Sequence, residues 1–232
     1  IIGTEDGSSI KSFFDTYLKN QPSKFLILNG VLKNKFSNLM TKKKIKILSV
    51  SRLEKNKNID ILIKSINHIP IKLRKHFYLE IIGDGKERTD LELLLKNLKL
   101  NKFVKFIGDR DNYEVFKHFT ESDIYVSCNE FGQLSNSNLE AISSGLCVIF
   151  VKTNVNNDHR IREKLLKTDN VIWVEKDSSG LALSKQIIKL IMNQKKIRQY
   201  KKNTRQLSKV LPSVGERIKW EIDKIENLNE VF

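Results

Sequence analysis

The chain has 232 residues, of which 40% are hydrophobic and 30% are charged, so it can form one full domain with additional elements and is not expected to be disordered. Its 42 Lys and Arg residues outnumber the 27 Asp and Glu residues, and the net charge of +15 favours phosphate-rich partners such as nucleotides, anionic lipid surfaces or nucleic acid. No apolar run reaches the roughly 20 residues that span a bilayer and no signal-peptide pattern opens the chain, so we expect a cytoplasmic protein.

The first 32 residues are expected to form a separate piece. A helical pattern covers residues 10–18, and a strand is expected at residues 25–28, followed by a turn at Asn29 and Gly30. Because the chain has no initiating Met and opens within a strand or turn pattern, we expect it to be a fragment of a longer protein.

From Lys43 onward, short β-branched or aromatic runs alternate with helical patterns, which is typical of parallel strands joined by right-handed helical crossovers. Several runs are apolar throughout, as expected for strands that are buried on both faces. The expected strands are residues 45–50, 77–82, 104–107, 124–127, 148–151 and 171–174, and the helices that follow are 181–192, 195–209 and one beginning near Pro212. The fold class is therefore α/β, a doubly wound Rossmann-like parallel sheet with flanking helices.

The loops that follow the strands are the candidate functional sites, because ligands of doubly wound sheets bind beyond the carboxyl ends of the strands. The loop SRLEKNKN follows the first strand of the sheet and places Arg52 and Lys57 before a helix. Arg can donate two parallel hydrogen bonds to phosphate oxygens and Lys supplies a mobile point charge, so the pair suits a diphosphate. In a chain this basic, two solvated surface cations are the alternative.

A second candidate loop, CNEFGQLSNSNLEAISSG, follows the fourth strand of the sheet. The backbone N–H groups of residues 136–138 are expected to face the crevice from a helix start, and Asn136 or Ser137 could instead be an ordinary N-cap. Glu140 lies about one turn into this helix. It either serves the site or interacts with the helix dipole.

Other kinds of site find little support. Cys128 and Cys147 lie in apolar strand-like runs and are expected to be buried free thiols. The four His residues are scattered, so we expect no metal site. The sequence 83–85, Gly-Asp-Gly, does not extend to G-x-G-x-x-G, so no nicotinamide, flavin or other cofactor is expected. Few aromatic residues interleave with the Lys-rich helices, so nucleic acid is not an expected partner.

Four motifs occur in a fixed order and spacing, namely SRLEKNKNIDILI, LEIIGDGKERTDLELLL, VKFIGDRDN and LSNSNLEAISSGLCVI. In this arrangement the chain resembles the retaining family-4 glycosyltransferases of GT-B fold (glycosyl transferases group 1), from about residue 43 to residue 228. The resemblance implies that residues 1–32 are a remnant of the N-terminal acceptor domain and the hinge. It further implies that residues 33–228 are the nucleotide-sugar donor-binding domain and that residues 229–232 are a tail.

The resemblance also implies roles for matching residues. Arg52 and Lys57 match the basic pair that holds the donor diphosphate and acts in catalysis, and Glu140 matches the second Glu of an E-x7-E motif that contacts the donor ribose. Residues 106–108 match the segment whose backbone faces the nucleobase, and residues 133–136 match the loop that meets the sugar and phosphates. The implied donor-binding set is Arg52, Lys57, Gly83, Phe106, Ile107, Gly108, Glu130, Gln133, Leu134, Ser135, Asn136, Ser137, Leu139 and Glu140.

One position departs from the family pattern. Gly132 stands where the first Glu of the motif is expected. Glu130 is the nearby carboxylate, and we hypothesise that it takes the place of the absent one in contacting the donor sugar.

The implied activity is transfer of a sugar from a nucleoside-diphosphate sugar to an acceptor hydroxyl with retention and without a required metal, in cell-envelope polysaccharide or glycolipid synthesis. A glycan or glycolipid acceptor would bind through the other domain, so this fragment alone is expected to be inactive. The alternatives are a catalytically inactive nucleotide-sugar-binding relic and an epimerase of the same fold, which would need further carboxylates and a His in the crevice. The basic balance also predicts salt-dependent peripheral attachment to the anionic inner face of a membrane.

Overall fold

The computed structural model describes residues 2–5, 16–17, 25–33, 36–39, 44–130, 134–152 and 165–229. Most of the helix expected at residues 10–18 lies outside this part of the chain, as do Gly132 and Gln133.

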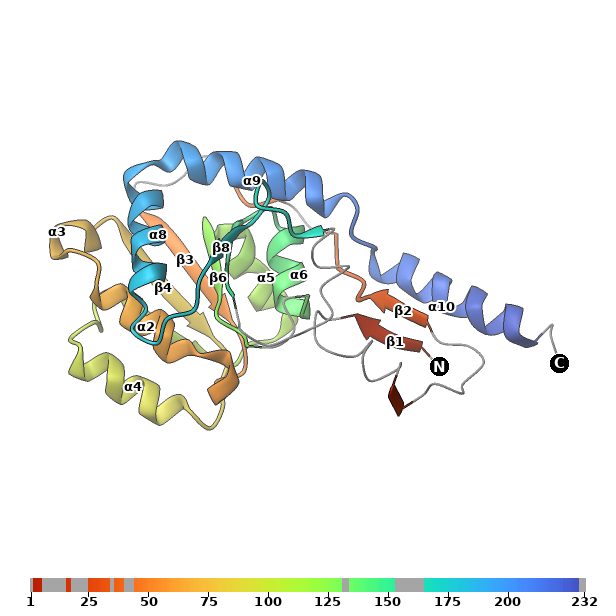
Figure 1. The fold of residues 1–232 in the computed structure, drawn as a ribbon, viewed down its shortest axis with the longest axis horizontal. Helices are drawn as coiled ribbons and strands as arrows, with labels where there is room; N and C mark the ends of the chain where they lie inside the picture. The colour runs from red at the N-terminus through yellow and green to blue at the C-terminus, as the bar shows by residue number, and fades with distance from the viewer. Residues whose placement is uncertain are drawn as a thin grey trace.

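The centre of the molecule is a six-stranded, fully parallel sheet with the strand order β5-β4-β3-β6-β7-β8 (Figure 1). Its strands are β3 (Ile45–Val50), β4 (Phe77–Ile82), β5 (Val104–Gly108), β6 (Ile124–Ser127), β7 (Cys147–Val151) and β8 (Ile172–Val174). All six expected strands are confirmed, each within one residue at either end. The order is that of a doubly wound Rossmann-like sheet, in which the direction of winding reverses between β3 and β6.

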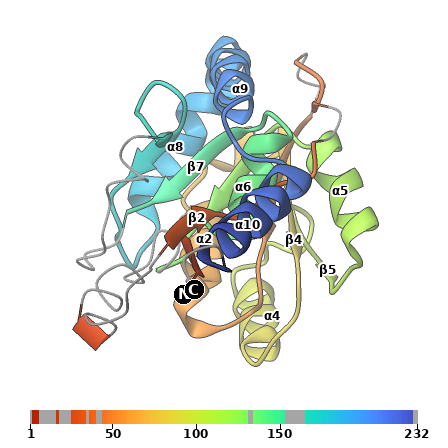
Figure 2. The ribbon, with the colours of Figure 1, turned by 90° about the vertical axis from the view of Figure 1, so that its right-hand side faces the viewer.

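Helices cover both faces of this sheet (Figure 2). The helical elements are η1 (Lys55–Lys57), α2 (Ile59–Asn67), α3 (Ile71–Arg74), α4 (Arg88–Asn97), α5 (Asn112–Glu121), α6 (Asn136–Ser143), α8 (Leu181–Met192), α9 (Gln194–Ser208) and α10 (Val214–Asn229). Alternate residues of each strand enter two separate apolar clusters, one packed against α2, α4 and α8 and the other against α5 and α6. The α9 helix contributes Ile197 to the first cluster and Leu207 to the second.

The α9 helix is anchored at the amino ends of the strands. Lys201 is fully buried, and its ammonium lies 3.3 Å from Oδ1 of Asp123, the residue before β6. Thr204 Oγ1 donates to the carbonyl of Asn170, just before β8. These two contacts place α9 at the end of the sheet opposite the carboxyl ends of the strands.

A second sheet of two parallel strands, β1 (Ile2–Glu5) and β2 (Phe25–Leu28), lies beside α10 (Figures 1 and 2). The ring of Trp220 on α10 meets the ring of Phe25 edge-to-face with centroids 5.8 Å apart, and Arg217 Nη1 donates to the carbonyl of Leu28 at 3.0 Å. Helix α10 therefore joins the main domain to the N-terminal strands.

The expected turn at Asn29 and Gly30 is wrong, because neither residue lies in a turn. The next residue, Val31, instead forms a parallel bridge with Ser213. A Cβ atom on Gly30 would lie 2.6 Å from Cα of Val214, so glycine is needed for the close approach of these two segments. The division of the chain at residue 32 stays a prediction.

Candidate functional site

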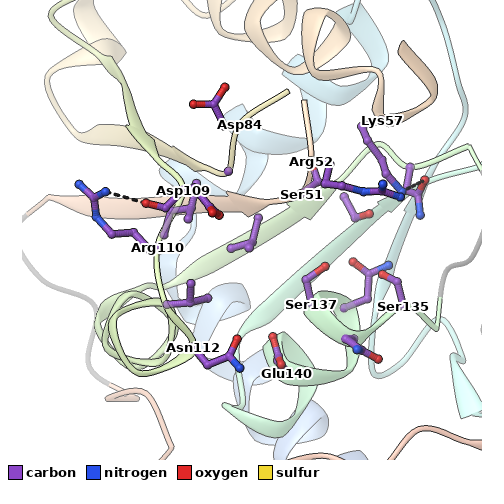
Figure 3. Close-up of a pocket in the computed structure, with 18 residues that line it drawn as sticks. Ser51, Arg52, Lys57, Asp84, Asp109, Arg110, Asn112, Ser135, Ser137 and Glu140 are labelled. Carbon is purple, nitrogen blue, oxygen red and sulfur yellow. Dashed lines mark hydrogen bonds between the residues drawn. The ribbon is translucent and has the colours of Figure 1, made fainter. Parts of the chain in front are cut away.

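A pocket of about 780 Å³ opens at the carboxyl ends of the strands, where the winding reverses between β3 and β6 (Figure 3). The loops after β3, β4, β5 and β6 line it, together with the first turns of α5 and α6. This position is where a doubly wound sheet is expected to bind its ligand, and the volume falls within the roughly 300–1,000 Å³ that is usual for small-molecule sites.

The structure brings half of the expected donor-binding residues together around this pocket. Those that line it are Arg52, Lys57, Gly83, Ser135, Asn136, Ser137 and Glu140. Arg52 and Lys57 come from the β3 loop, Gly83 from the β4 loop and the other four from the start of α6.

The other expected residues that the structure describes do not line the pocket. Leu134 and Leu139 are both 0% exposed, because their side chains belong to the second apolar cluster. Phe106 packs under the guanidinium of Arg88, 4.7 Å from the ring centroid. Ile107 and Gly108 also do not line it, and Gln133 lies outside the described residues.

Most of the lining residues that sequence reasoning missed follow one rule. They are the last residue of a strand or lie within two residues after it, as with Ser51, Asp84 and Asp109. The further lining residues of this kind are Val50, Ile82, Arg110, Ser127 and Asn129. Asn112 and Val115 reach the pocket from α5, and Asn138 lines it from the start of α6, where its backbone N–H is expected. The geometry of a parallel sheet could have found most of them, because its carboxyl ends converge on one crevice.

The loop after β3 is held by close backbone packing against the loop after β4. Leu53 N–H donates to the carbonyl of Asp84 at 2.8 Å, and Ser51 N–H donates to the carbonyl of Ile82 at 3.1 Å. Gly83 has a φ of +121°, and a Cβ atom there would lie 2.0 Å from the carbonyl oxygen of Ser51. Glycine therefore permits the contact that fixes the segment leading into Arg52.

Hydrogen bonds join the loop after β3 to the described part of the loop after β6. Lys57 Nζ donates to Oδ1 of Asn129 at 3.0 Å, and Asn58 Nδ2 donates to the carbonyl of Cys128 at 3.0 Å. Glu130 N–H donates to the carbonyl of Asn56 at 2.9 Å. The Lys57 ammonium is thus held at the switch point of the sheet (Figure 3).

Arg52 is less constrained than Lys57. Its side chain is 77% exposed, and its Nη1 lies 3.2 Å from Oε1 of Glu54. Such an exposed ion pair contributes little to stability, so Arg52 can turn toward an anionic ligand at small cost.

The α6 helix presents its amino end to the pocket. The N-cap is Ser135, so the alternative assignment of Asn136 or Ser137 as the cap is wrong. The Ser135 side chain makes no capping hydrogen bond, and the first backbone N–H groups of a helix have no acceptor within the helix itself. Together with the helix dipole, these groups form an electropositive wall suited to phosphate.

Glu140 projects into the pocket from the second turn of α6 (Figure 3). It is half-buried, and burial raises the pKa of its carboxyl above the usual range. Its carboxylate has no hydrogen-bond or ion-pair partner within the described segments. The helix dipole acts mainly on the first turn, so dipole stabilisation does not explain this position well.

Glu130 lies outside the pocket lining. Its Oε1 accepts from Lys176 Nζ at 3.1 Å, which gives the carboxylate a partner of its own. Contact between Glu130 and a donor sugar stays a prediction, and it would require this ion pair to open.

The described residues contain no group of three or more His, Cys, Asp or Glu arranged to hold a metal ion. Cys128 and Cys147 are buried free thiols, as expected, and burial raises the pKa of Cys128 to about 12. His68, His76 and His118 do not line the pocket, and His159 lies outside the described part of the chain. Over the same residues, every helix is too short or too polar to cross a membrane.

A family model described as glycosyl transferases group 1 matches residues 31–207. The chain belongs to this family. Together with the structural likeness below, the match identifies the main domain as the C-terminal domain of a GT-B glycosyltransferase. The expected fold class and family are therefore confirmed.

Individual relatives agree with the family assignment. An uncharacterised glycosyltransferase of Methanocaldococcus jannaschii is 30% identical over 77% of this chain and 43% of its own length. The N-acetylgalactosamine-N,N'-diacetylbacillosaminyl-diphospho-undecaprenol 4-alpha-N-acetylgalactosaminyltransferase of Campylobacter jejuni is 27% identical over 68% of this chain and 40% of its own length.

Among solved structures, the pneumococcal O-GlcNAc transferase GtfA, in complex with UDP and GlcNAc, aligns with a TM-score of 0.74. It is 18% identical, and the alignment covers 94% of this chain and 43% of that protein, so it supports the fold alone. This chain spans about two fifths of the length of each of these three proteins.

Proposed function

We propose that the chain binds a nucleoside-diphosphate sugar, with UDP as the nucleotide, and serves as the donor domain of a transferase that glycosylates an acceptor hydroxyl. The observation that carries the proposal is the convergence of Lys57, Arg52 and the α6 amino end on one pocket at the switch point. The UDP-N-acetylglucosamine--peptide N-acetylglucosaminyltransferase GtfA subunit of Streptococcus agalactiae is 28% identical over 66% of this chain and 29% of its own length, and the UDP-linked donor in its name supports the choice of nucleotide. Calorimetric titration with UDP and with uridine tests it, and absence of UDP binding would contradict it.

In the proposed reaction, Arg52 and Lys57 stabilise the negative charge that develops on the departing diphosphate. The acceptor hydroxyl attacks from the same face, so the anomeric configuration is retained. The two cations and the α6 backbone N–H groups supply the charge that a metal supplies in other phosphate chemistry, so we propose that no metal or cofactor is required.

The proposed acceptor is a glycan or glycolipid of the cell envelope. The Campylobacter relative acts on a diphospho-undecaprenol-linked sugar, which supports a lipid-linked acceptor. We propose that acceptor recognition belongs to the part of these relatives that this chain does not match, so the chain alone binds donor without turnover.

Two other functions find less support. An epimerase would need a His in the crevice, and no described His lines the pocket. A catalytically inactive relic is favoured only by Gly132, which stands where the family motif has a Glu.

Glu140 predicts a pH dependence of nucleotide binding. An ionised carboxylate can accept hydrogen bonds from both ribose hydroxyls, whereas a protonated one loses part of this capacity. Because burial raises the pKa of Glu140, UDP affinity should begin to fall at a higher pH than an ordinary Glu would give. Titrations at decreasing pH should show this fall in the wild type, and Glu140→Gln should bind more weakly with a flatter profile between neutral pH and the usual Glu range.

As pH falls, the contribution of Glu140 to the free energy of unfolding should become more favourable, whereas UDP affinity should decrease. The folded-state pKa of Glu140 lies above its unfolded value, so the ionised carboxylate destabilises the ligand-free fold at neutral pH, and this cost disappears as pH falls through the folded pKa. Glu140→Gln should therefore leave the free energy of unfolding unchanged or raise it. Loss of both stability and affinity would instead indicate that Glu140 has a structural role only.

A further inference from the structure

One segment carries a charge excess that the donor pocket does not use. From Ser178 to Gly215, the sequence holds nine Lys or Arg residues and no Asp or Glu. Two of the nine are engaged within the fold, because Lys201 pairs with Asp123 and Arg205 lies over the ring of Phe36. The other seven are exposed on α8, α9 and the residue after α9.

Four of the exposed cations form a stripe along α9. They follow one another at intervals of three, four and seven residues, so they share one face of the helix. We call these four residues the basic ridge, which consists of Lys195, Arg198, Lys202 and Lys209. Within the described ranges, none of the four has an ion-pair partner.

Helix α9, which carries the ridge, differs from three other helices in how its charged residues are paired. Three helices pair a cation with a carboxylate one turn away, as in Lys64 with Asp60, Arg88 with Glu92 and Arg217 with Glu221. In α9, Arg198 and Lys202 instead place like charges four residues apart, which disfavours a helix. An anionic partner would offset this repulsion.

The ridge is also remote from the donor pocket. Lys201 and Thr204 anchor α9 to the segments that precede β6 and β8, whereas the pocket opens at the carboxyl ends of the strands. In Figure 1, α9 runs along the upper edge of the domain. A partner bound to the ridge therefore leaves the pocket open, and the charge of the ridge is not explained by the nucleotide.

We propose that the basic ridge docks this chain on an anionic phospholipid membrane. The inference rests on the proposed function, because a lipid-linked acceptor places the reaction at a membrane. Met192, the last residue of α8, is 73% exposed and lies three residues before Lys195 in the sequence, so an apolar side chain is exposed close to the start of the ridge. A single-stranded nucleic acid would call for exposed aromatic residues, and α9 has one aromatic residue, the half-buried Tyr200.

The basic ridge attracts the membrane through the combined positive potential of its four cations, and it does not select one lipid headgroup. A hollow of about 440 Å³ at the start of α9 is lined by Lys195 and Lys196 but also by Asp169. The carboxylate of Asp169 opposes phosphate binding there, so attachment depends on the density of negative charge at the surface.

The test replaces all four ridge residues with Gln and measures co-sedimentation with vesicles of phosphatidylglycerol and phosphatidylcholine. A matched control variant loses the same charge elsewhere, through replacement of the exposed Lys72, Lys75, Lys102 and Lys105 with Gln. Because each basic residue near an anionic surface contributes somewhat less than tenfold to partitioning, the ridge variant should bind about a hundredfold to a thousandfold more weakly than the wild type. The control variant should lose less than about tenfold, and added salt should weaken wild-type binding steeply.

Equal losses in the two variants, or equal binding to neutral and anionic vesicles, would overturn the proposal. The proposal would also be overturned if the wild-type protein did not co-sediment with anionic vesicles but bound single-stranded RNA, and the ridge variant lost that RNA binding. The ridge would then be a nucleic-acid-binding surface. Phosphatidylserine should replace phosphatidylglycerol at equal charge, and a strong preference for either lipid would contradict binding by the field alone. UDP titration of the same proteins separates the two proposals: absence of UDP binding in the wild type would overturn the donor function without changing the vesicle comparison.

Discussion

Replacing Lys57 with Ala is expected to weaken UDP binding by about tenfold to a hundredfold. A charge-assisted hydrogen bond to phosphate contributes roughly 1.5 to 3 kcal/mol, and each 1.4 kcal/mol corresponds to about a factor of ten in affinity. The Lys57 ammonium is already held at the pocket by Oδ1 of Asn129, so little entropy is lost when it meets a phosphate. Calorimetric titration with UDP measures the effect.

The same substitution at Arg52 should have a smaller effect, toward the lower end of that range. Arg52 is 77% exposed and has Glu54 as a competing partner, so it must be ordered when the ligand binds. Both variants should bind uridine about as well as the wild type, because the nucleoside has no phosphate.

Lys55→Ala is the matched control for these variants. Lys55 lies in the same 3-10 helix as Lys57, is exposed and does not line the pocket. Its loss should change UDP affinity by less than about tenfold, since an exposed cation contributes under about 1 kcal/mol. If Lys55→Ala and Lys57→Ala weaken binding equally, the effect comes from the net charge of the chain and not from a diphosphate contact.

The strands could be located from the sequence because each one combines two independent signals. Ile45–Val50 and Phe77–Ile82, for example, are rich in β-branched or aromatic residues and are followed by turn-forming residues, and their bounds are as expected. The alternation with helical patterns then leaves few topologies to consider. The turn expected at Asn29 and Gly30 failed because glycine there serves a close approach to Val214, which depends on a contact between distant segments.

The site was predicted less completely, for a related reason. Charged residues in a loop after a strand, such as Arg52 and Lys57, reach the pocket because the end of the strand places them there. The resemblance includes Leu134 and Leu139 in the site, but both side chains are buried in the second apolar cluster. Leu134 precedes α6, and Leu139 lies on the side of that helix that faces the core, because a helix turns each residue by 100°. The pairing of Lys57 with Asn129 joins residues 72 positions apart, so no local pattern could have indicated it.

Gly83→Ala is expected to lower the free energy of unfolding by about 2 to 5 kcal/mol and to weaken UDP binding as well. The φ of +121° is strained for any residue with a Cβ atom, and the added methyl group would lie 2.0 Å from the Ser51 carbonyl oxygen. That oxygen belongs to the backbone, so the two loops must separate, and the segment leading into Arg52 moves with them. Urea denaturation with an unchanged slope measures the stability loss, and titration with UDP measures the effect on the site.

Gly215→Ala supplies the control for Gly83→Ala, because the same methyl group meets no atom within 4 Å there. Gly215 lies in the first turn of α10, where Ala is the better helix former, so this variant should be as stable as the wild type or more stable by up to about 1 kcal/mol. Its UDP affinity should be unchanged. If Gly83→Ala proved as stable as Gly215→Ala and bound UDP normally, the β3 and β4 loops would not be in the tight contact that positions Arg52. If Gly83→Ala lost stability but kept full UDP affinity, the contact would serve the fold alone, and the position of Arg52 would have to be fixed by the hydrogen bonds between the β3 and β6 loops.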